Sequence, residues 1–334
     1  MTKDDRIKPN KIENLVFEGG GVKGSAYAGA MQVFQELGLF EQVENIGGTS
    51  AGSITAVMLA VGGGSDGLLE SVENTNFAQF LNDPWGIVGD AKRIIFNYGM
   101  HSGDDFVTIL KAYIGRFSGD PELTFSDLAE LRQQNPDKFK NLSIIASNLT
   151  RQQAQVFNVE NHPTLPIWLA VRASMSIPML FEPVLIDGDY HVDGGLAWNY
   201  PIDLYDPMVS GNDADELVRD YNPATLGFFL EPKVLVAQGK QFKTSHYPIN
   251  SLKSYGLALG SYLYETANAQ HLQAEDKKRT IFIDDLGVSG TNFDLSKQRV
   301  DELISSGRQA VETYFDIKDN AAVKHQSKPE AMSE

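Results

Sequence analysis

Cysteine is absent from this chain of 334 residues. Its absence excludes disulfide bonds, thiolate nucleophiles and thiolate metal sites, and it is compatible with a reducing cytoplasm. Basic residues are also scarce, because 28 Lys and Arg stand against 44 Asp and Glu, a formal net charge of −16. Apart from a short run at residues 277–279 the sequence has no basic stripe, which argues against nucleic acid as a partner.

Long hydrophobic runs are missing as well. The longest apolar stretches, such as residues 54–61, are far shorter than the roughly 18 residues that span a bilayer. The first eleven residues lack the apolar core of a signal peptide, so we expect a soluble, cytoplasmic protein. The acidic balance removes general attraction to anionic membranes, and contact with lipid would therefore need local apolar groups or delivery by a partner.

Strand and helix patterns alternate from the start of the chain. Short apolar runs predict strands, and apolar residues at helical spacing predict helices over residues 24–37, 51–61, 166–175 and 251–277. The predicted strands are residues 14–17, 42–46, 142–146, 154–157, 184–186, 190–192, 226–230 and 281–284. The order β-α-β-α predicts an α/β fold, with a parallel sheet and helices on its faces.

A helical insertion is expected over residues 65–131, where it could cap a site. Its apolar residues, including Phe77, Phe80, Leu81, Trp85, Ile94, Ile95, Phe96 and Tyr98, fit either a lid or acyl groove or ordinary core packing. No internal repeat or linker divides the chain, so we expect one domain over residues 12–315. Residues 1–11 and 317–334 are expected to be disordered.

Two glycine-rich elements each lie where a predicted strand passes into a helix. The first is Gly19, Gly20, Gly21, Val22, Lys23 and Gly24, and the second is Gly48, Thr49, Ser50, Ala51 and Gly52. In the second, a Gly-x-Ser-x-Gly turn would present the Ser50 hydroxyl as a nucleophile. In the first, the amides of Gly20, Gly21 and Val22 at a helix N-terminus would point at an oxyanion. Lys23 either strengthens the positive field there or is an ordinary exposed lysine.

The first element also fits the dinucleotide pattern Gly-x-Gly-x-x-Gly. That pattern requires an acidic residue at the end of the second strand to hold the ribose, whereas this strand ends in Gly47, Gly48, Thr49 and Ser50. A nucleotide-binding protein that keeps the loop remains an alternative, as does a glycine turn that merely packs helix on strand.

The base that would activate Ser50 has two candidates. An α/β-hydrolase triad would use Ser50, Asp193 and either His246 or His271. A dyad would use Asp193 directly, in the turn Asp193, Gly194 and Gly195 that follows a predicted strand. An aspartate with a pKa near its usual ~3.9 is a weak base, but apolar surroundings would raise the pKa. The residue pattern alone leaves both candidates open.

Taken together, the three motifs resemble those of the patatin-like phospholipases. That family carries a Gly-Gly-Gly-x-Lys/Arg-Gly oxyanion loop, a Gly-x-Ser-x-Gly turn and an Asp-Gly-Gly/Ala turn, in this order. The segments at residues 171–178, 181–183, 199–201 and 287–296 are similar to the family as well. The resemblance covers roughly residues 12–315, and three motifs in order are more specific than one.

The resemblance implies a three-layer α/β/α fold with a mostly parallel sheet and a Ser50–Asp193 dyad. The implied activity is hydrolysis of acyl esters of glycerolipids, with no metal and no cofactor. The implied partner is a phospholipid or other glycerolipid at a membrane or micelle surface, with peripheral membrane association during catalysis. An unidentified activator or a second copy of the chain would be a further partner.

Overall fold

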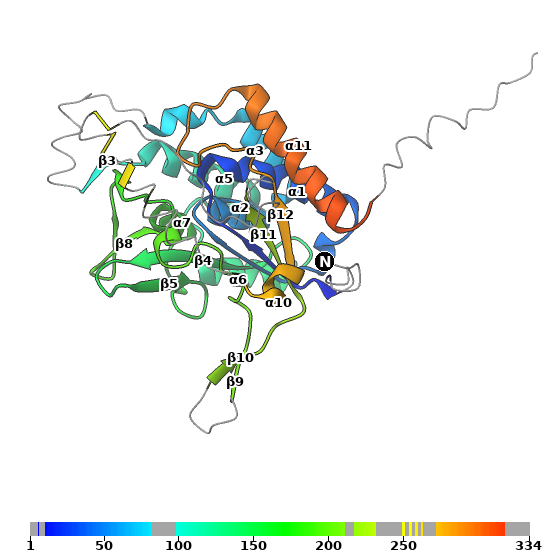
Figure 1. Cartoon of the computed structure of the whole chain (residues 1–334). Helices are drawn as coiled ribbons and strands as arrows, with labels where there is room; N and C mark the ends of the chain where they lie inside the picture. The colour runs from blue at the N-terminus through cyan, green and yellow to red at the C-terminus, as the bar shows by residue number, and fades with distance from the viewer. Residues whose placement is uncertain are drawn as a thin grey trace, which may run out of the picture.

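An eight-stranded sheet forms the centre of the described protein, in the order β12-β11-β1-β2-β4-β8-β7 with β5 pairing to β4 (Figure 1). This computed structural model describes residues 6, 11–81, 98–210, 217–231, 249–250, 254–255, 258–259, 262 and 272–317. The strands of the sheet are β1 (Asn14–Phe17), β2 (Asn45–Thr49), β4 (Asn141–Asn148), β5 (Gln153–Phe157), β7 (Val184–Ile186), β8 (Asp189–Asp193), β11 (Thr225–Leu230) and β12 (Thr280–Ile283).

Most of the sheet is parallel. Strands β12, β11, β1, β2 and β4 run parallel, whereas β5 and β8 run antiparallel to β4, and β7 forms a hairpin with β8. Because parallel strands end at the same edge, the segments that follow β1 and β2 lie side by side. Phe17 pairs with Gly48, so the two glycine-rich elements leave the sheet next to each other.

Helices flank the sheet, which confirms the predicted α/β class with a mostly parallel sheet. Along one face α1 and α11 lie together (Figure 1). The helices are α1 (Ala26–Glu36), α2 (Ala51–Ala60), α3 (Gly64–Asn74), α5 (Asp104–Ser118), α6 (Phe125–Gln134), α7 (Ile167–Ser174), α10 (Ala274–Lys278) and α11 (Lys297–Tyr314). Short 3-10 turns are η3 (Gly21–Ser25), η4 (Phe40–Gln42), η5 (Phe77–Leu81) and η6 (Gly194–Leu196).

Strand β1 is buried on both faces, as expected of a central parallel strand. Leu15 and Phe17 pack into the main core, and Phe17 stacks on Phe228 with ring centroids 4.9 Å apart. Val16 faces the other way and packs with Tyr200 and Ile202 in a second, smaller cluster.

Several predicted boundaries were wrong. The second strand is Asn45–Thr49 rather than 42–46, because Phe40–Gln42 forms a 3-10 turn and the pairing with β4 continues to Thr49. The first helix begins at Ala26 rather than at residue 24, after the 3-10 turn Gly21–Ser25. Four short strands were not predicted: β3 (Gly99–His101), β6 (Met179–Phe181), β9 (Met208–Ser210) and β10 (Leu217–Arg219).

Other predictions fall wholly or largely outside the described residues. These are the two termini and most of the helix over residues 251–277. At the C-terminal end of that prediction residues 272–273 are not helical, and α10 is a separate helix that begins after the extended residue Gln273. The described part of residues 65–131 contains most of α3 together with η5, β3, α5 and α6, and residues 82–97 lie outside the described part of the chain. Among the described helices none combines the length and apolar character needed to cross a bilayer.

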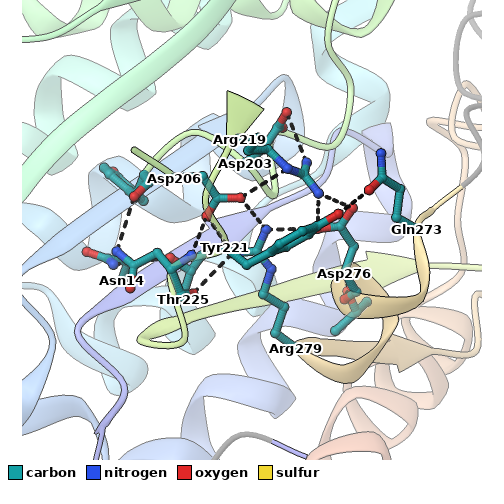
Figure 2. Close-up of polar contacts among 12 residues, drawn as sticks. Asn14, Asp203, Asp206, Arg219, Tyr221, Thr225, Gln273, Asp276 and Arg279 are labelled. Carbon is teal, nitrogen blue, oxygen red and sulfur yellow. Dashed lines mark hydrogen bonds and ion pairs between the residues drawn. The ribbon is translucent and has the colours of Figure 1, made fainter. Parts of the chain in front are cut away.

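At the edge of the sheet where β11 and β12 begin, charged side chains form a paired network (Figure 2). Arg279 contacts Asp206 at 2.5 Å and Asp276 at 2.8 Å, and Arg219 contacts Asp276 at 2.9 Å and Asp203 at 3.3 Å. Asp206, Asp276 and Arg279 are almost fully buried. Each buried charge in this network therefore has an opposite charge beside it.

Candidate active site

Ser50 occupies the tight turn between β2 and α2, where the sequence predicted it. Its backbone angles, φ 51° and ψ −122°, are rare for a residue with a side chain and are typical of a strained nucleophile turn. The Ser50 amide donates to Ser174 Oγ at 2.8 Å, and Ser174 Oγ donates to the Ile145 carbonyl at 2.5 Å. The end of α7 therefore holds the turn in its strained shape.

Glycine is required on both sides of Ser50 because other backbone lies close. A Cβ on Gly52 would lie 2.3 Å from the Phe17 carbonyl oxygen, and a Cβ on Gly48 would lie 2.2 Å from the Gly52 carbonyl oxygen. Thr49 contributes a hydrogen bond from its Oγ1 to the Trp198 carbonyl at 3.0 Å. The turn is thus packed directly against the end of β1 and the segment that follows Asp193.

Asp193 lies at the end of β8, opposite Ala146 of β4. Ser50 Oγ donates a hydrogen bond to Asp193 Oδ2 at 2.6 Å, so the structure brings the two predicted catalytic residues together. The other carboxylate oxygen, Oδ1, accepts from the Gly195 amide at 2.8 Å. Gly194 fits only as glycine, because a Cβ there would lie 2.3 Å from the Ile145 carbonyl oxygen.

The Asp193 carboxyl group is fully buried. Burial raises its pKa to about 7, although the hydrogen bonds from Ser50 and Gly195 act in the opposite direction. Among the described residues no lysine, arginine or histidine side chain is paired with it. A carboxylate with a pKa near neutrality has the basicity that a proton acceptor for a hydroxyl needs.

The first glycine element lies beside the start of α2. A Cβ on Gly24 would come 2.9 Å from the Ala51 Cβ, so glycine allows the two elements to touch. Within the described part of the chain, the amides of Gly20 and Gly21 have no acceptor, whereas the Gly19 amide donates to the Asn199 carbonyl at 3.1 Å. Gly20 and Gly21 therefore keep two donors available for a ligand next to Ser50.

Two further residues of this element are already engaged. The Val22 amide donates to the Gly290 carbonyl at 3.0 Å, so the expected third donor is not available. The Lys23 ammonium lies 3.1 Å from Asp285 Oδ2 and is mostly buried. Lys23 is thus an ion-paired residue rather than an ordinary exposed lysine.

Glu18 is a buried acid that sequence reasoning missed. It directly precedes the glycine element, and its carboxylate accepts from the Leu230 amide at 2.7 Å and from Asn199 Nδ2 at 3.0 Å. Burial raises the pKa of Glu18 to about 8, while nearby Lys23 and the two hydrogen bonds lower it. Asn199 Nδ2 also donates to the Gly19 carbonyl at 3.0 Å, which fixes the first residue of the loop.

Ser174 is a second residue that the sequence does not point to individually, although it lies in the segment 171–178 that is similar to the family. Its role depends on a contact with Ser50, which is far away in the sequence and adjacent only in the fold. The two histidines of the predicted triad alternative, His246 and His271, lie outside the described residues. The described residues contain no cluster of three or more His, Asp or Glu that could hold a metal ion.

An apolar pocket of about 590 Å³, including its open mouth, begins at the two glycine-rich elements. Its walls come from the two elements and from helices α2, α3 and α5, and Phe77 of the predicted lid or groove lies among them. Representative lining residues are Gly21, Ala51, Ile54, Val72, Phe77 and Leu110. The other residues proposed for the lid include Trp85, Ile94, Ile95 and Phe96, which lie outside the described residues.

Comparison with known proteins identifies the family. An uncharacterized protein of Acanthamoeba polyphaga mimivirus is 28% identical over 308 residues, which cover 92% of this chain and 94% of that protein. A "Probable lipid hydrolase" of Invertebrate iridescent virus 6 is 25% identical over 201 residues, which cover 59% of this chain and 64% of that protein.

Among solved structures, VipD from Legionella pneumophila shares the fold with a TM-score of 0.58 at 19% identity, covering 92% of this chain and 67% of that one. The family model described as "Patatin-like phospholipase" matches residues 15–206, more than half of the chain and the part that carries all three motifs. This chain belongs to the patatin-like phospholipase family.

Proposed function

We propose that this protein is a lipid acyl hydrolase of the phospholipase A or lysophospholipase type, with Ser50 as nucleophile and Asp193 as general base. The observation that carries the proposal is the 2.6 Å hydrogen bond from Ser50 Oγ to a buried carboxylate. Membership of the patatin-like family supports a hydrolase of lipid esters.

The proposed reaction begins when Ser50 Oγ attacks the acyl carbonyl carbon while its proton passes to Asp193 Oδ2. The carbonyl oxygen gains negative charge and accepts hydrogen bonds from the Gly20 and Gly21 amides, each donor of this kind being worth about 2.7–4 kcal/mol. When the C–O ester bond breaks, Asp193 returns the proton to the leaving alcohol. The acyl group then remains on Ser50 as an ester.

The second half repeats the first with water in place of Ser50. Asp193 takes a proton from water, whose oxygen attacks the acyl-enzyme carbonyl. Collapse of the intermediate releases the fatty acid, and the proton on Asp193 returns to Ser50 Oγ. One carboxylate therefore serves both halves, which requires a pKa close to the working pH.

The apolar pocket supports a lipid as the acyl donor. It begins at Gly21 and Ala51, on either side of the site where the reacting carbonyl would lie, and its lining is mainly apolar. A fatty acyl chain is a ligand that such a pocket would bury favourably. We propose peripheral contact with a membrane or micelle in a cytoplasmic setting as the way the substrate is reached, with an activator or a second copy of the chain as a further partner.

The test is to measure ester hydrolysis, with a panel of defined glycerolipids and a p-nitrophenyl ester, by the wild type and by single variants. Ser50→Ala and Asp193→Asn should each lose at least about 10,000-fold in kcat, as in other serine hydrolases that lose a catalytic group. His246→Ala and His271→Ala should keep the activity. An inactive histidine variant beside an active Asp193→Asn would replace the dyad with a triad.

A second measurement separates an enzyme from a binding protein. A fluorophosphonate should label the wild type at Ser50 and leave Ser50→Ala unlabelled. Absence of labelling in the wild type, together with retention on an immobilised nucleotide, would instead favour the nucleotide-binding alternative.

A further inference from the structure

A loop from the C-terminal part of the chain lies directly on the glycine element. Residues 285–290, here called the brace loop, follow β12 and precede α11, outside the residues 15–206 that match the family model. Gly290 accepts a hydrogen bond from the Val22 amide at 3.0 Å. Asp285 receives the Lys23 ammonium at 3.1 Å. The brace loop therefore contacts the glycine element at two successive residues.

The backbones of the two segments approach too closely for side chains. A Cβ on Gly21, which has φ +56°, would lie 2.0 Å from the Gly290 carbonyl oxygen. A Cβ on Gly290 would lie 2.7 Å from the Gly20 carbonyl oxygen. The peptide groups of Gly20 and Gly21, whose amides are the available donors, thus lie against Gly290.

The ion pair at the other end of the brace loop is shielded from solvent. The exposed fractions of the Lys23 and Asp285 side chains are 18% and 2%. The second oxygen of Asp285, Oδ1, accepts from the Gly287 amide at 2.8 Å. Asp285 therefore binds the Lys23 ammonium with one carboxylate oxygen and the backbone of its own loop with the other.

Helix α11 donates hydrogen bonds to the brace loop and to the residue that precedes it. Arg299 Nη2 donates to the Leu286 carbonyl at 2.6 Å, and Ser306 Oγ donates to the carbonyl of Asp284 at 2.7 Å. Helix α11 packs along α1, and α1 follows the glycine element (Figure 1). The brace loop and the glycine element are therefore both attached to this pair of helices.

We infer that the brace loop positions the oxyanion donors, with Asp285 and Gly290 as positioning residues and Lys23 acting as a tether to Asp285. This inference rests on the proposed function, in which the Gly20 and Gly21 amides bind the oxyanion. The Lys23 ammonium is paired with the Asp285 carboxylate, and such an ion pair contributes little field at the substrate. Contacts that fix the backbone of Gly20 and Gly21 instead keep their two amides directed at one point. Misplacing reacting groups by about 1 Å costs on the order of 100-fold in rate.

A double-mutant cycle separates the tether from a direct electrostatic role. Lys23→Met and Asp285→Asn should each lower kcat about 10-fold or more with KM unchanged, and the double variant should be no slower than the slower single variant. Lys23→Arg, which keeps the ion pair, should retain most of the activity. If Asp285→Asn, which frees the positive charge, keeps or raises kcat while Lys23→Met lowers it, Lys23 acts on the oxyanion and the inference is overturned.

Gly290→Ala tests the backbone contact. It should lower kcat and the rate of fluorophosphonate labelling about 100-fold, while the pH midpoint of kcat/KM stays near that of the wild type because Asp193 is untouched. Thermal unfolding of each variant reports its folded state. If Gly290→Ala does not fold, the Lys23 and Asp285 cycle decides alone.

Two control variants carry the same substitutions, Asp to Asn and Lys to Met, at exposed positions after the brace loop. Asp294→Asn, exposed in the same connection between β12 and α11, and Lys297→Met, exposed at the start of α11, should keep wild-type kcat. Wild-type kcat in Asp285→Asn, Lys23→Met and Gly290→Ala would overturn the positioning role while Ser50 labelling still supports the hydrolase. An inactive and unlabelled wild type would instead refute the proposed function.

Discussion

Buried carboxylates lie at both ends of the sheet, but they are paired with cations at one end and not at the other. Where β11 and β12 begin, the buried Asp206 and Asp276 each contact Arg279 (Figure 2). Where β2 and β8 end, the equally buried Asp193 carboxylate accepts hydrogen bonds only from the Ser50 hydroxyl and the Gly195 amide among the described residues.

The difference fits the role that the proposed function gives to each carboxylate, a structural ion pair for Asp206 and Asp276 and a proton acceptor for Asp193. In the paired network burial alone would lower the pKa of Arg279, but hydrogen bonds to Asp206 and Asp276 outweigh it and raise that pKa, so the cation is kept. At Asp193 nothing offsets burial enough, and the pKa rises to about 7. A carboxylate that a cation stabilised fully would be too weak a base for a serine hydroxyl.

Removing the cation from the paired end should have the largest effect on stability. Arg279→Met leaves two buried carboxylates without their closest partner, and we expect a loss of about 3–5 kcal/mol in the free energy of unfolding. Urea unfolding at neutral pH measures it. Lys278→Met, which removes an exposed pair with Glu275, should cost less than about 1 kcal/mol. Equal losses in the two variants would show that Arg279 does not hold the network.

Removing the charge of Asp193 should change the free energy of unfolding in the opposite direction, toward a more stable protein as pH rises. Between about pH 4 and pH 7 native Asp193 keeps a proton that the unfolded chain has lost, so this residue makes the wild type less stable as pH rises through that window. Relative to its value at pH 4, the stability of Asp193→Asn over the wild type should therefore grow by about 4 kcal/mol and level off above pH 8.

Thermal or urea unfolding of both proteins across this range measures the difference. Glu18, whose pKa burial raises to about 8, acts in the same direction but is present in both proteins, so its contribution cancels. A difference that stays constant from pH 4 to pH 8 would mean that the Asp193 pKa is not raised.

The same pKa predicts how activity depends on pH. In the proposed mechanism only ionised Asp193 accepts the Ser50 proton, so kcat/KM should approach a tenfold fall per pH unit below about pH 7, or roughly 50-fold from pH 7 to pH 5. A soluble p-nitrophenyl ester allows the measurement without a membrane. Glu18→Gln should leave the midpoint in place, and a midpoint that moves with Glu18 would assign the titration to the wrong carboxyl group.

The sequence predicted the parts of the site that depend on local backbone geometry. Glycines stand where the chain must bend sharply or pass close to other backbone, as at Gly48 and Gly52 around Ser50 and at Gly194 after Asp193. These requirements are therefore visible in the local sequence. The fold class followed from alternating strand and helix patterns. The boundary of β2 was wrong because a 3-10 turn and a strand that contains glycine do not show a clear apolar alternation.

What the sequence did not predict depends on residues that meet only in the fold. Three hydrogen bonds join segments from distant parts of the chain. They are the bonds from the Ser50 amide to Ser174, from the Leu230 amide to Glu18 and from the Val22 amide to Gly290. The raised pKa of Asp193 is likewise a property of its burial. No local pattern distinguishes such a residue from an ordinary aspartate in a turn.

The smallest effect is expected at the apolar pocket, which lies at the Asp193 end of the sheet and is proposed to hold the acyl chain of the substrate. Val72 on α3 lines this pocket, whereas its neighbour Glu73 is exposed. Val72→Trp should fill part of the space and shift the ratio of kcat/KM for long over short acyl esters about tenfold toward short chains. Glu73→Trp is the matched control on the same helix and should leave the ratio unchanged. An equal shift in both variants, or none in Val72→Trp, would mean that the acyl chain lies elsewhere and that the apolar pocket is a packing feature of the helices.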